Sequence, residues 1–178
     1  MTIDASPWGP GAVLELEGAV REYFGEGLAK DDVSVFGFDV GNPKGQEVWE
    51  SLAALVALRL WRQHWAQERC CLLARGDSVT MLTLVARLKG TAPGISLIGR
   101  ELALEFVASA YRPILAEHIP GVANSWADAL SRRARDVSRW TRPAGLDQAT
   151  EVPVPSRPRA WCITLSPPML PPTCRQGG

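Results

Sequence analysis

Soft metal ligands are scarce in this sequence of 178 residues, which contains two histidines and four cysteines. The cysteines form no Cys-x-x-Cys pair and have no histidine at zinc-binding spacing, which argues against a structural zinc site. They are also too few and too scattered for a secreted disulfide framework. We therefore expect reduced thiols in an intracellular protein, and the sequence leaves the cytoplasm and the nucleus open as compartments.

The sequence also lacks net charge, because nineteen Lys and Arg residues balance nineteen Asp and Glu residues. The composition therefore gives no sign of nucleic-acid binding, and such a partner would have to be bound by a local cluster. Only three of the basic residues are Lys. Arg binds phosphate bidentately, although a GC-rich coding bias would favour it equally.

Membrane and export signals are missing as well. No basic region followed by an apolar run marks the amino terminus. The longest apolar stretch, residues 52–60, is interrupted by Arg59 and is too short to span a bilayer. We expect neither a signal peptide nor a membrane partner.

The length and a hydrophobic content of 46% suffice for one well-buried core but hardly for two. Eight of the fourteen prolines fall at or after Pro143, where no periodic apolar pattern survives. The sequence therefore predicts one domain over residues 1–140. It predicts a Pro-rich tail, disordered or loosely docked, over residues 141–178.

The first part of the chain predicts a meander followed by a long helix. Short apolar stretches broken by Gly, Pro and charged residues predict three antiparallel strands within residues 2–28. Residues 29–45 are interpreted as a connection, with residues 33–38 as a candidate extended segment. Residues 46–65 contain strong helix formers and no Pro or Gly, which predicts a largely buried helix.

Strands and helices alternate in the remainder. Residues 70–74 form a continuous apolar run typical of a buried strand, and residues 79–88 return to helical spacing. A second helix is expected over residues 98–111, an extended segment over residues 113–119 and a last helix over residues 124–135. This order predicts an α/β fold with a mixed sheet.

Four carboxylates occupy the ends of these expected elements: Asp4 in the first strand, Glu50 near the start of the main helix, Asp77 after the apolar strand and Asp128 near the start of the last helix. Strand ends and helix starts converge on one edge of an α/β sheet, where ligands usually bind. Each acid alone also has a structural explanation, because helix dipoles and turns favour carboxylates. Their order and local sequence decide the interpretation.

The segments around these acids resemble ribonuclease H domains of retroelement polyproteins, of the type 1, reverse-transcriptase-associated kind. The family's opening strand and turn are similar to TIDASPWGPGAVL (residues 2–14), and its main helix is similar to ESLAALVAL (residues 50–58). GDS (residues 76–78) resembles the third acidic motif, and HIPGVANSWADALSR (residues 118–132) resembles the fourth most specifically. The resemblance implies a ribonuclease H-like fold with a mixed five-stranded sheet and helices packed on its faces.

The chemistry that this resemblance implies is hydrolysis of the RNA strand of an RNA–DNA hybrid. A carboxylate set without soft ligands favours Mg²⁺, with Mn²⁺ as the alternative. The resemblance implies two ions held by Asp4, Glu50, Asp77 and Asp128, with Asp4 bridging them. It also implies that His118, ten residues before Asp128, assists proton transfer or product departure; an ordinary surface histidine is the alternative.

Five neighbours of the acids are candidates for nucleic-acid contact. Ser6, Ser78 and Asn124 are expected to contact the sugar-phosphate backbone or ribose 2′-hydroxyl groups. Equally, Ser6 would shape a turn and Asn124 would cap the last helix. Arg132 and Arg133 begin an Arg-rich segment that would lie on phosphates, or would simply complement the helix dipole.

Partners and competing hypotheses follow from the same resemblance. It implies an RNA–DNA hybrid as substrate and an upstream polymerase domain as a partner, while the oligomeric state is left open. A catalytically inactive ribonuclease H-like binding or connection module is the main alternative. An integrase-like nuclease and a non-functional remnant of a mobile element are the others. The presence of all four acids, in the order Asp, Glu, Asp, Asp, favours the nuclease.

Overall fold

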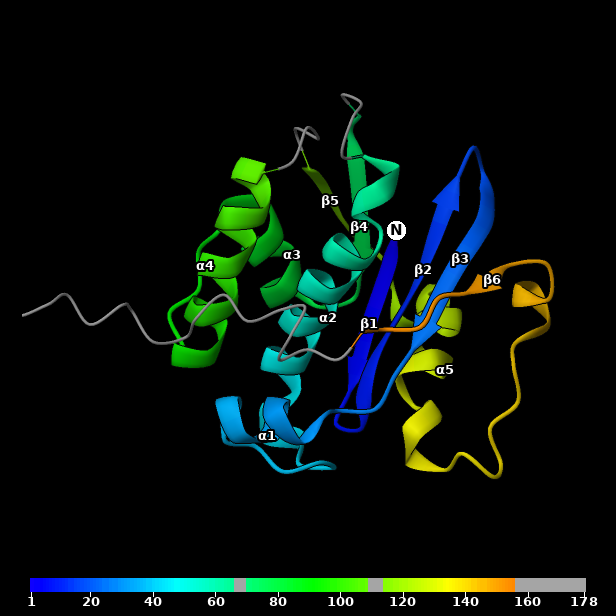
Figure 1. Cartoon of the computed structure of the whole chain (residues 1–178), viewed down its shortest axis with the longest axis horizontal. Helices are drawn as coiled ribbons and strands as arrows, with labels where there is room; N and C mark the ends of the chain where they lie inside the picture. The colour runs from blue at the N-terminus through cyan, green and yellow to red at the C-terminus, as the bar shows by residue number, and fades with distance from the viewer. Residues whose placement is uncertain (66–69, 109–113, 156–178) are drawn as a thin grey trace, which may run out of the picture.

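A six-stranded mixed sheet lies at the centre of the chain (Figure 1). The structure is a computed structural model and describes residues 1–65, 70–108 and 114–155. The sheet order is β5-β4-β1-β2-β3-β6. The strands are β1 (Thr2–Ser6), β2 (Gly9–Leu16), β3 (Ala19–Gly25), β4 (Leu72–Gly76), β5 (Ile114–His118) and β6 (Thr150–Glu151).

The topology places β1 in the interior of the sheet. β1, β2 and β3 form an antiparallel meander, whose second turn has positive φ angles at Glu17 and Gly18. β4 pairs parallel to β1, and β5 pairs parallel to β4. Because β1 and β4 run in the same direction, Ser6 and Gly76 end their strands at the same end of the sheet.

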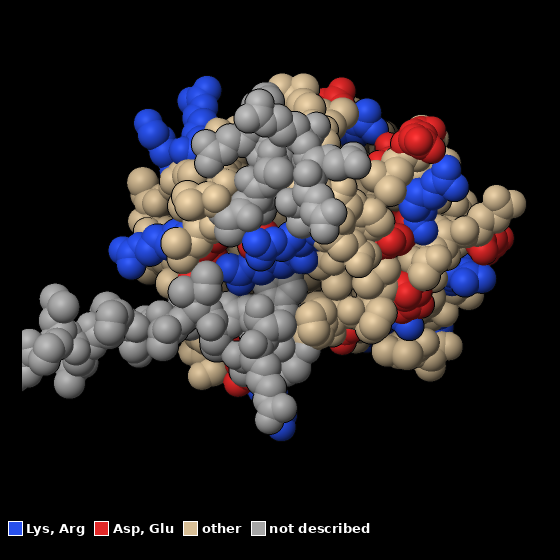
Figure 2. All heavy atoms as spheres, turned by 45° about the horizontal axis from the view of Figure 1, so that its top comes forward, with Lys and Arg blue, Asp and Glu red and all other residues tan. Residues whose placement is uncertain are grey.

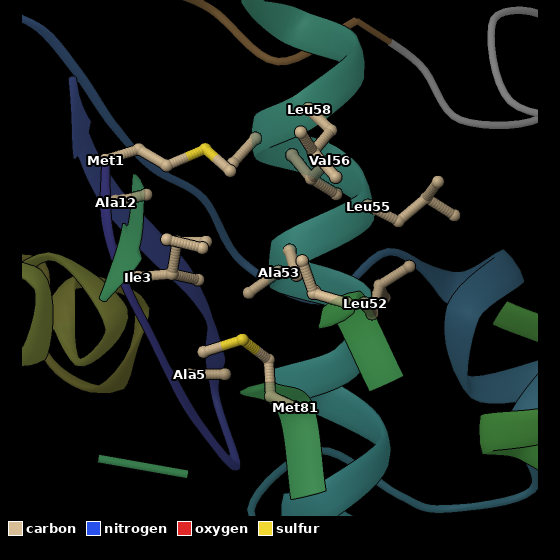
Figure 3. Close-up of a cluster of buried hydrophobic side chains, with 14 of the residues drawn as sticks. Met1, Ile3, Ala5, Ala12, Leu52, Ala53, Leu55, Val56, Leu58 and Met81 are labelled. Atoms are coloured by element: carbon tan, nitrogen blue, oxygen red, sulfur yellow. The ribbon is translucent and has the colours of Figure 1, made fainter. Parts of the chain in front are cut away.

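One face of the sheet is covered by the long helices. These are α2 (Gln46–Leu60), α3 (Val79–Arg87) and α4 (Pro93–Ala108), and the short α1 (Lys30–Phe36) precedes them. α2 packs on β1 and β2 and also contacts α3 and α4, which explains why its residues are apolar on nearly every side. Figure 3 shows Ile3 and Ala5 of β1 facing Ala53 of α2 in this core.

The opposite face is covered by α5 (Ser125–Ser131), which packs on β1, β2 and β3. A second, smaller core joins Leu130 of α5 to Val13 and Tyr23 of the sheet and to Leu146. From there the chain reaches the free edge of β3, where β6 pairs with it in parallel. Residues 141–155 therefore pack on the sheet and cover its edge strand.

Most expected elements are present. The predicted α/β class, the meander and the long helix from residue 46 are confirmed, although that helix ends at Leu60. The sheet has six strands where five were expected. The additional strand, β6, was missed because it lies in the Pro-rich part, whose sequence shows no strand pattern. The extended segment expected over residues 33–38 is wrong, because residues up to Phe36 belong to α1.

The division at residue 140 stays a prediction. Of the predicted tail, residues 156–178 lie outside the described residues. Among the helices that the structure describes, none combines the length and hydropathy that crossing a bilayer would require.

Candidate active site

The four predicted acids come from four different elements and act on one another. Asp4 lies within β1, Asp77 directly follows β4, Glu50 belongs to α2 and Asp128 belongs to α5. Because β1 and β4 are parallel, Asp4 and Asp77 lie toward the same end of the sheet. The charges of the other three acids all raise the pKa of Asp4, so the four carboxylates share one electrostatic environment.

Asp4 is the buried member of the set, with 7% of its surface exposed. Burial is the main cause that raises its pKa to about 7, and the neighbouring acids add to the rise. The hydroxyl of Ser131 donates to Oδ2 at 2.7 Å and opposes this rise. The amide of Asn124 lies 3.4 Å from Oδ1. A carboxyl with such a pKa is only about half ionised at pH 7, and a positive charge brought to it would favour its ionised form.

Glu50 is connected to β1 through Gln46. The Gln46 amide donates to the carbonyl oxygen of Ala5 at 2.5 Å and to Oε1 of Glu50 at 2.9 Å. Gln46 and Glu50 share one side of α2 because they are four residues apart. Burial raises the pKa of Glu50, while hydrogen bonds from Ser78 and Gln46 lower it.

Asp77 is exposed and lies beside His118, the histidine predicted for the site. Nε2 of His118 is 3.1 Å from the backbone oxygen of Asp77. The proximity follows from the sheet, since Gly76 and His118 are register partners of β4 and β5. A β-carbon added at Gly121 would lie 3.3 Å from Oδ2 of Asp77, so the segment after β5 also borders this carboxylate.

Asp128 is partly exposed and is paired within its own helix. Nε of Arg132 donates to Oδ1 of Asp128 at 2.7 Å, an i,i+4 pair at the surface of α5. An exposed pair of this kind contributes little to stability, so either partner can exchange it for another ligand at small cost.

The predicted nucleic-acid contacts have internal partners. Ser6 and Asn124 are each 1% exposed. The Ser6 hydroxyl donates to the backbone oxygen of Ser131, and the Asn124 amide donates to that of Ile3. Asn124 is the residue before α5, but its side chain makes no capping hydrogen bond there. Their contact with a substrate stays a prediction.

The other three candidates are also engaged by the protein. Ser78 caps α3, because its hydroxyl accepts from the backbone N–H of Met81 at 3.2 Å. Arg132 pairs with Asp128, and Arg133 pairs with Glu151 of β6. Nucleic-acid binding by these three side chains likewise stays a prediction.

The donor chemistry of the set suits a hard divalent cation. All four side chains offer carboxylate oxygen, the ligand that Mg²⁺ and Mn²⁺ prefer. Burial is the main cause of the raised pKa of Asp4, and the negative charges of Asp77, Asp128 and Glu50 add to it, so a bound cation would relieve their repulsion. Among the described residues, no three His, Cys, Asp or Glu side chains are arranged so that they could hold an ion as they stand. The donor atoms and the negative charge of the four acids thus suit such an ion, whereas their arrangement in this structure does not form a complete set of ligands.

Gln46 and Ser131 were not predicted from the sequence. Each makes a hydrogen bond to one of the four acids. The spacing of Gln46 from Glu50 would have indicated one of them, since residues four apart on a helix are neighbours. No local pattern indicates that Ser131 reaches Asp4, because that contact joins distant parts of the chain.

Comparisons with known proteins support the fold. No protein-family model and no curated protein sequence matches the chain. Among solved structures, the chain is similar to the RNase H1 of the halophilic archaeon Halobacterium salinarum NRC-1, with a TM-score of 0.58 and 17% sequence identity. The similarity covers 77% of this chain and 96% of that chain. The chain therefore has a ribonuclease H-like fold, with six strands where five were expected.

Proposed function

We propose that this chain is a metal-dependent endonuclease that hydrolyses the RNA strand of RNA–DNA hybrids. The observation that carries the proposal is the convergence of four acids, from two parallel strands and two helices, on the buried carboxyl of Asp4. The similarity to an RNase H1 supports it through the fold.

Asp4, Glu50, Asp77 and Asp128 would hold Mg²⁺ or Mn²⁺, two ions by resemblance. When bound, such ions stabilise the negative charge that develops on a phosphodiester during in-line hydrolysis. The chain's own residues orient the acids and exchange a proton. Gln46 orients Glu50, Ser131 and Asn124 orient Asp4, and the exposed imidazole of His118 can exchange a proton beside Asp77.

The biological context of this activity is also part of the proposal. The motifs around the four acids resemble those of retrotransposon reverse transcriptases. We therefore infer that the chain is part of such an enzyme or is derived from one. Its partner would be the polymerase domain that precedes the nuclease in those proteins. An intracellular location, in the cytoplasm or the nucleus, follows from the substrate.

The test is a cleavage assay with a labelled RNA–DNA hybrid, single-stranded RNA and duplex DNA, each in Mg²⁺, in Mn²⁺ and in EDTA. We expect cleavage of only the RNA strand of the hybrid, and only with metal. Asp77→Asn should lower the rate roughly a hundredfold or more, because it removes a proposed metal ligand. Asp39→Asn is the matched control, since Asp39 is an exposed acid outside the cluster.

Metal binding can be measured without cleavage. Mg²⁺ should raise the thermal midpoint of the wild-type protein and of Asp39→Asn, but not that of Asp77→Asn, because a ligand of the native state stabilises it. No cleavage of any substrate by a folded sample, in either metal, would refute the enzymatic proposal.

A catalytically inactive ribonuclease H-like binding or connection module is the second candidate. Two observations favour it: Arg132 already pairs with Asp128 at 2.7 Å, and the described acids do not form a ready set of three ligands. Hybrid binding without cleavage, together with no stabilisation by metal, would identify this alternative.

A further inference from the structure

Among the described residues, four of the five arginines from Arg132 onward pair with acids. Arg132 pairs with Asp128 and Arg133 with Glu151. Further along, Arg139 pairs with Asp136 and Arg142 with Asp147, each at 3.5 Å. These pairs satisfy much of the positive charge of the segment within the protein itself.

Arg135 differs from its neighbours. It is exposed, and no acidic side chain in the described part of the chain pairs with it. Its guanidinium lies over the ring of Trp8, with Cζ 4.8 Å from the ring centre. Stacking on an aromatic ring holds a guanidinium in place while its N–H donors stay available in the ring plane.

Trp8 is itself fixed by the backbone around it. The Trp8 N–H donates to the hydroxyl of Ser6 at 3.2 Å, and the Trp8 carbonyl accepts from the backbone of Leu28 at 2.9 Å. A β-carbon at Gly41 would lie 3.7 Å from the indole nitrogen, so the Gly41 backbone borders the ring. Gly41 has a φ of +86°, which makes a larger residue unfavourable there.

The pair lies at the same end of the sheet as the four acids. Trp8 occupies the turn between β1 and β2, four residues after Asp4, so their α-carbons are at most about 14 Å apart. Figure 1 shows this turn at the lower end of the sheet, with the yellow segment after α5 beside it. A duplex with phosphates every 3.4 Å or so along its axis could reach both places at once.

On the face that Figure 2 shows, which brings the other end of the sheet forward, Lys and Arg side chains lie among Asp and Glu toward the right and mostly apart from them toward the left. The chain has no net charge, so phosphate binding depends on individual unpaired cations.

We propose that Arg135, held over Trp8, binds a backbone phosphate of the nucleic acid whose scissile bond lies at the four acids. The inference rests on the proposed function for its substrate class and adds a residue that binds and positions that substrate. Arg135 makes the phosphate contact, and Trp8 acts through Arg135 by fixing the guanidinium.

The experiment measures binding of a fluorescein-labelled RNA–DNA hybrid by anisotropy, in EDTA, with the full chain, over a series of salt concentrations. Arg135→Ala should weaken binding about tenfold, as expected for loss of a charge-assisted contact. The slope of log affinity against log salt should fall by about one, the value for one phosphate contact. Arg139→Ala removes the same charge from the same segment and should stay within about twofold of wild type.

Trp8 provides a second, independent measurement. Trp8→Phe keeps an aromatic ring and should bind as wild type, whereas Trp8→Ala should weaken binding. If Trp8 acts through Arg135, the double variant Trp8→Ala, Arg135→Ala should bind no more weakly than Arg135→Ala alone. Unchanged thermal midpoints would show that these substitutions leave the fold intact.

The inference is overturned if Arg135→Ala binds as wild type, if Arg139→Ala loses as much affinity, or if wild type binds no nucleic acid. A hybrid that is bound through Arg135 but never cut in Mg²⁺ or Mn²⁺ would refute only the nuclease proposal. Equal affinity for hybrid and duplex DNA would still support the phosphate contact. It would contradict a preference for the hybrid in the proposed function.

Discussion

The hydroxyl of Ser131 lies 2.7 Å from Oδ2 of Asp4, although 127 residues separate them in the sequence. This hydrogen bond joins the central strand β1 to α5 and lowers the pKa of Asp4. The same hydroxyl lies 2.9 Å from the backbone oxygen of Asp128, so one serine contacts both ends of the predicted acidic set. Formation of the acidic site and docking of α5 on the sheet are therefore linked.

Ser131→Ala should lower hybrid hydrolysis by about ten- to a hundredfold, the range typical of residues that orient metal ligands. It should also destabilise the fold by about 1 kcal/mol through the lost buried hydrogen bond. Because that bond lowers the pKa of Asp4, its loss should move the acid limb of the pH–rate profile to higher pH. Ser138→Ala is the control, since its hydroxyl bonds the exposed Asp136. An unshifted acid limb would contradict a positioning role for Ser131.

Asp4→Asn should change how stability depends on pH. The pKa of Asp4 is raised from 3.8 to about 7 in the folded protein, so the native state binds the proton more tightly than the unfolded state. The stability that the neutral carboxyl provides is therefore complete below about pH 4 and is lost as pH rises to about 7. The shift corresponds to about 4 kcal/mol at most.

Chemical denaturation in EDTA at several pH values measures this effect. Between about pH 4 and 7 the free energy of unfolding should fall more steeply for wild type than for Asp4→Asn, which should be the more stable protein at pH 8. Mg²⁺ should narrow the difference at pH 8 by binding only the wild type. Parallel curves for the two proteins would show that Asp4 titrates normally.

Gln46→Glu should impair hydrolysis more than Gln46→Ala. Alanine removes the two hydrogen bonds to Ala5 and Glu50, for which we expect a loss of about tenfold. Glutamate has nearly the same shape but cannot donate, and it adds a negative charge beside Glu50. Hybrid affinity in EDTA should stay close to wild type for both variants. Lys44→Ala, an exposed change just before α2, is the control, and equal rates for all three variants would rule out the proposed orientation of Glu50.

The sequence was most informative where structure is local. The long helix from Gln46 and the meander of β1 to β3 follow from apolar periodicity and turn residues, and both are confirmed. The four acids could be selected because their order and local sequence resemble the ribonuclease H motifs, although only Asp77 directly follows the end of an element and Asp4 and Asp128 lie within theirs. The parallel pairing of β1 and β4, which brings two of them to one end of the sheet, is what an α/β order implies.

What the sequence did not show depends on tertiary packing. Residues 33–36 include two β-branched valines but form the last part of α1, which ends at Phe36 and is capped by Gly37 with a positive φ. β6 has only two residues, which are too few to show a strand pattern in the sequence. It pairs with β3 because the packing of the neighbouring segment brings it to that edge of the sheet. The contact of Ser131 with Asp4 and the stacking of Arg135 on Trp8 likewise join segments that are distant in sequence.

Leu146→Ala tests whether the folded domain extends past residue 140. Leu146 is 0% exposed and packs in the second core with Leu130, Val13 and Tyr23. Truncating a buried leucine leaves a cavity, so we expect a loss of about 2–5 kcal/mol in the free energy of unfolding, measured by urea denaturation of the full chain. Val137→Ala, at a side chain that is 70% exposed, should change it by less than about 0.5 kcal/mol. If Leu146→Ala is as mild as this control, the domain ends near residue 140 and the segment beyond it contributes little to the fold.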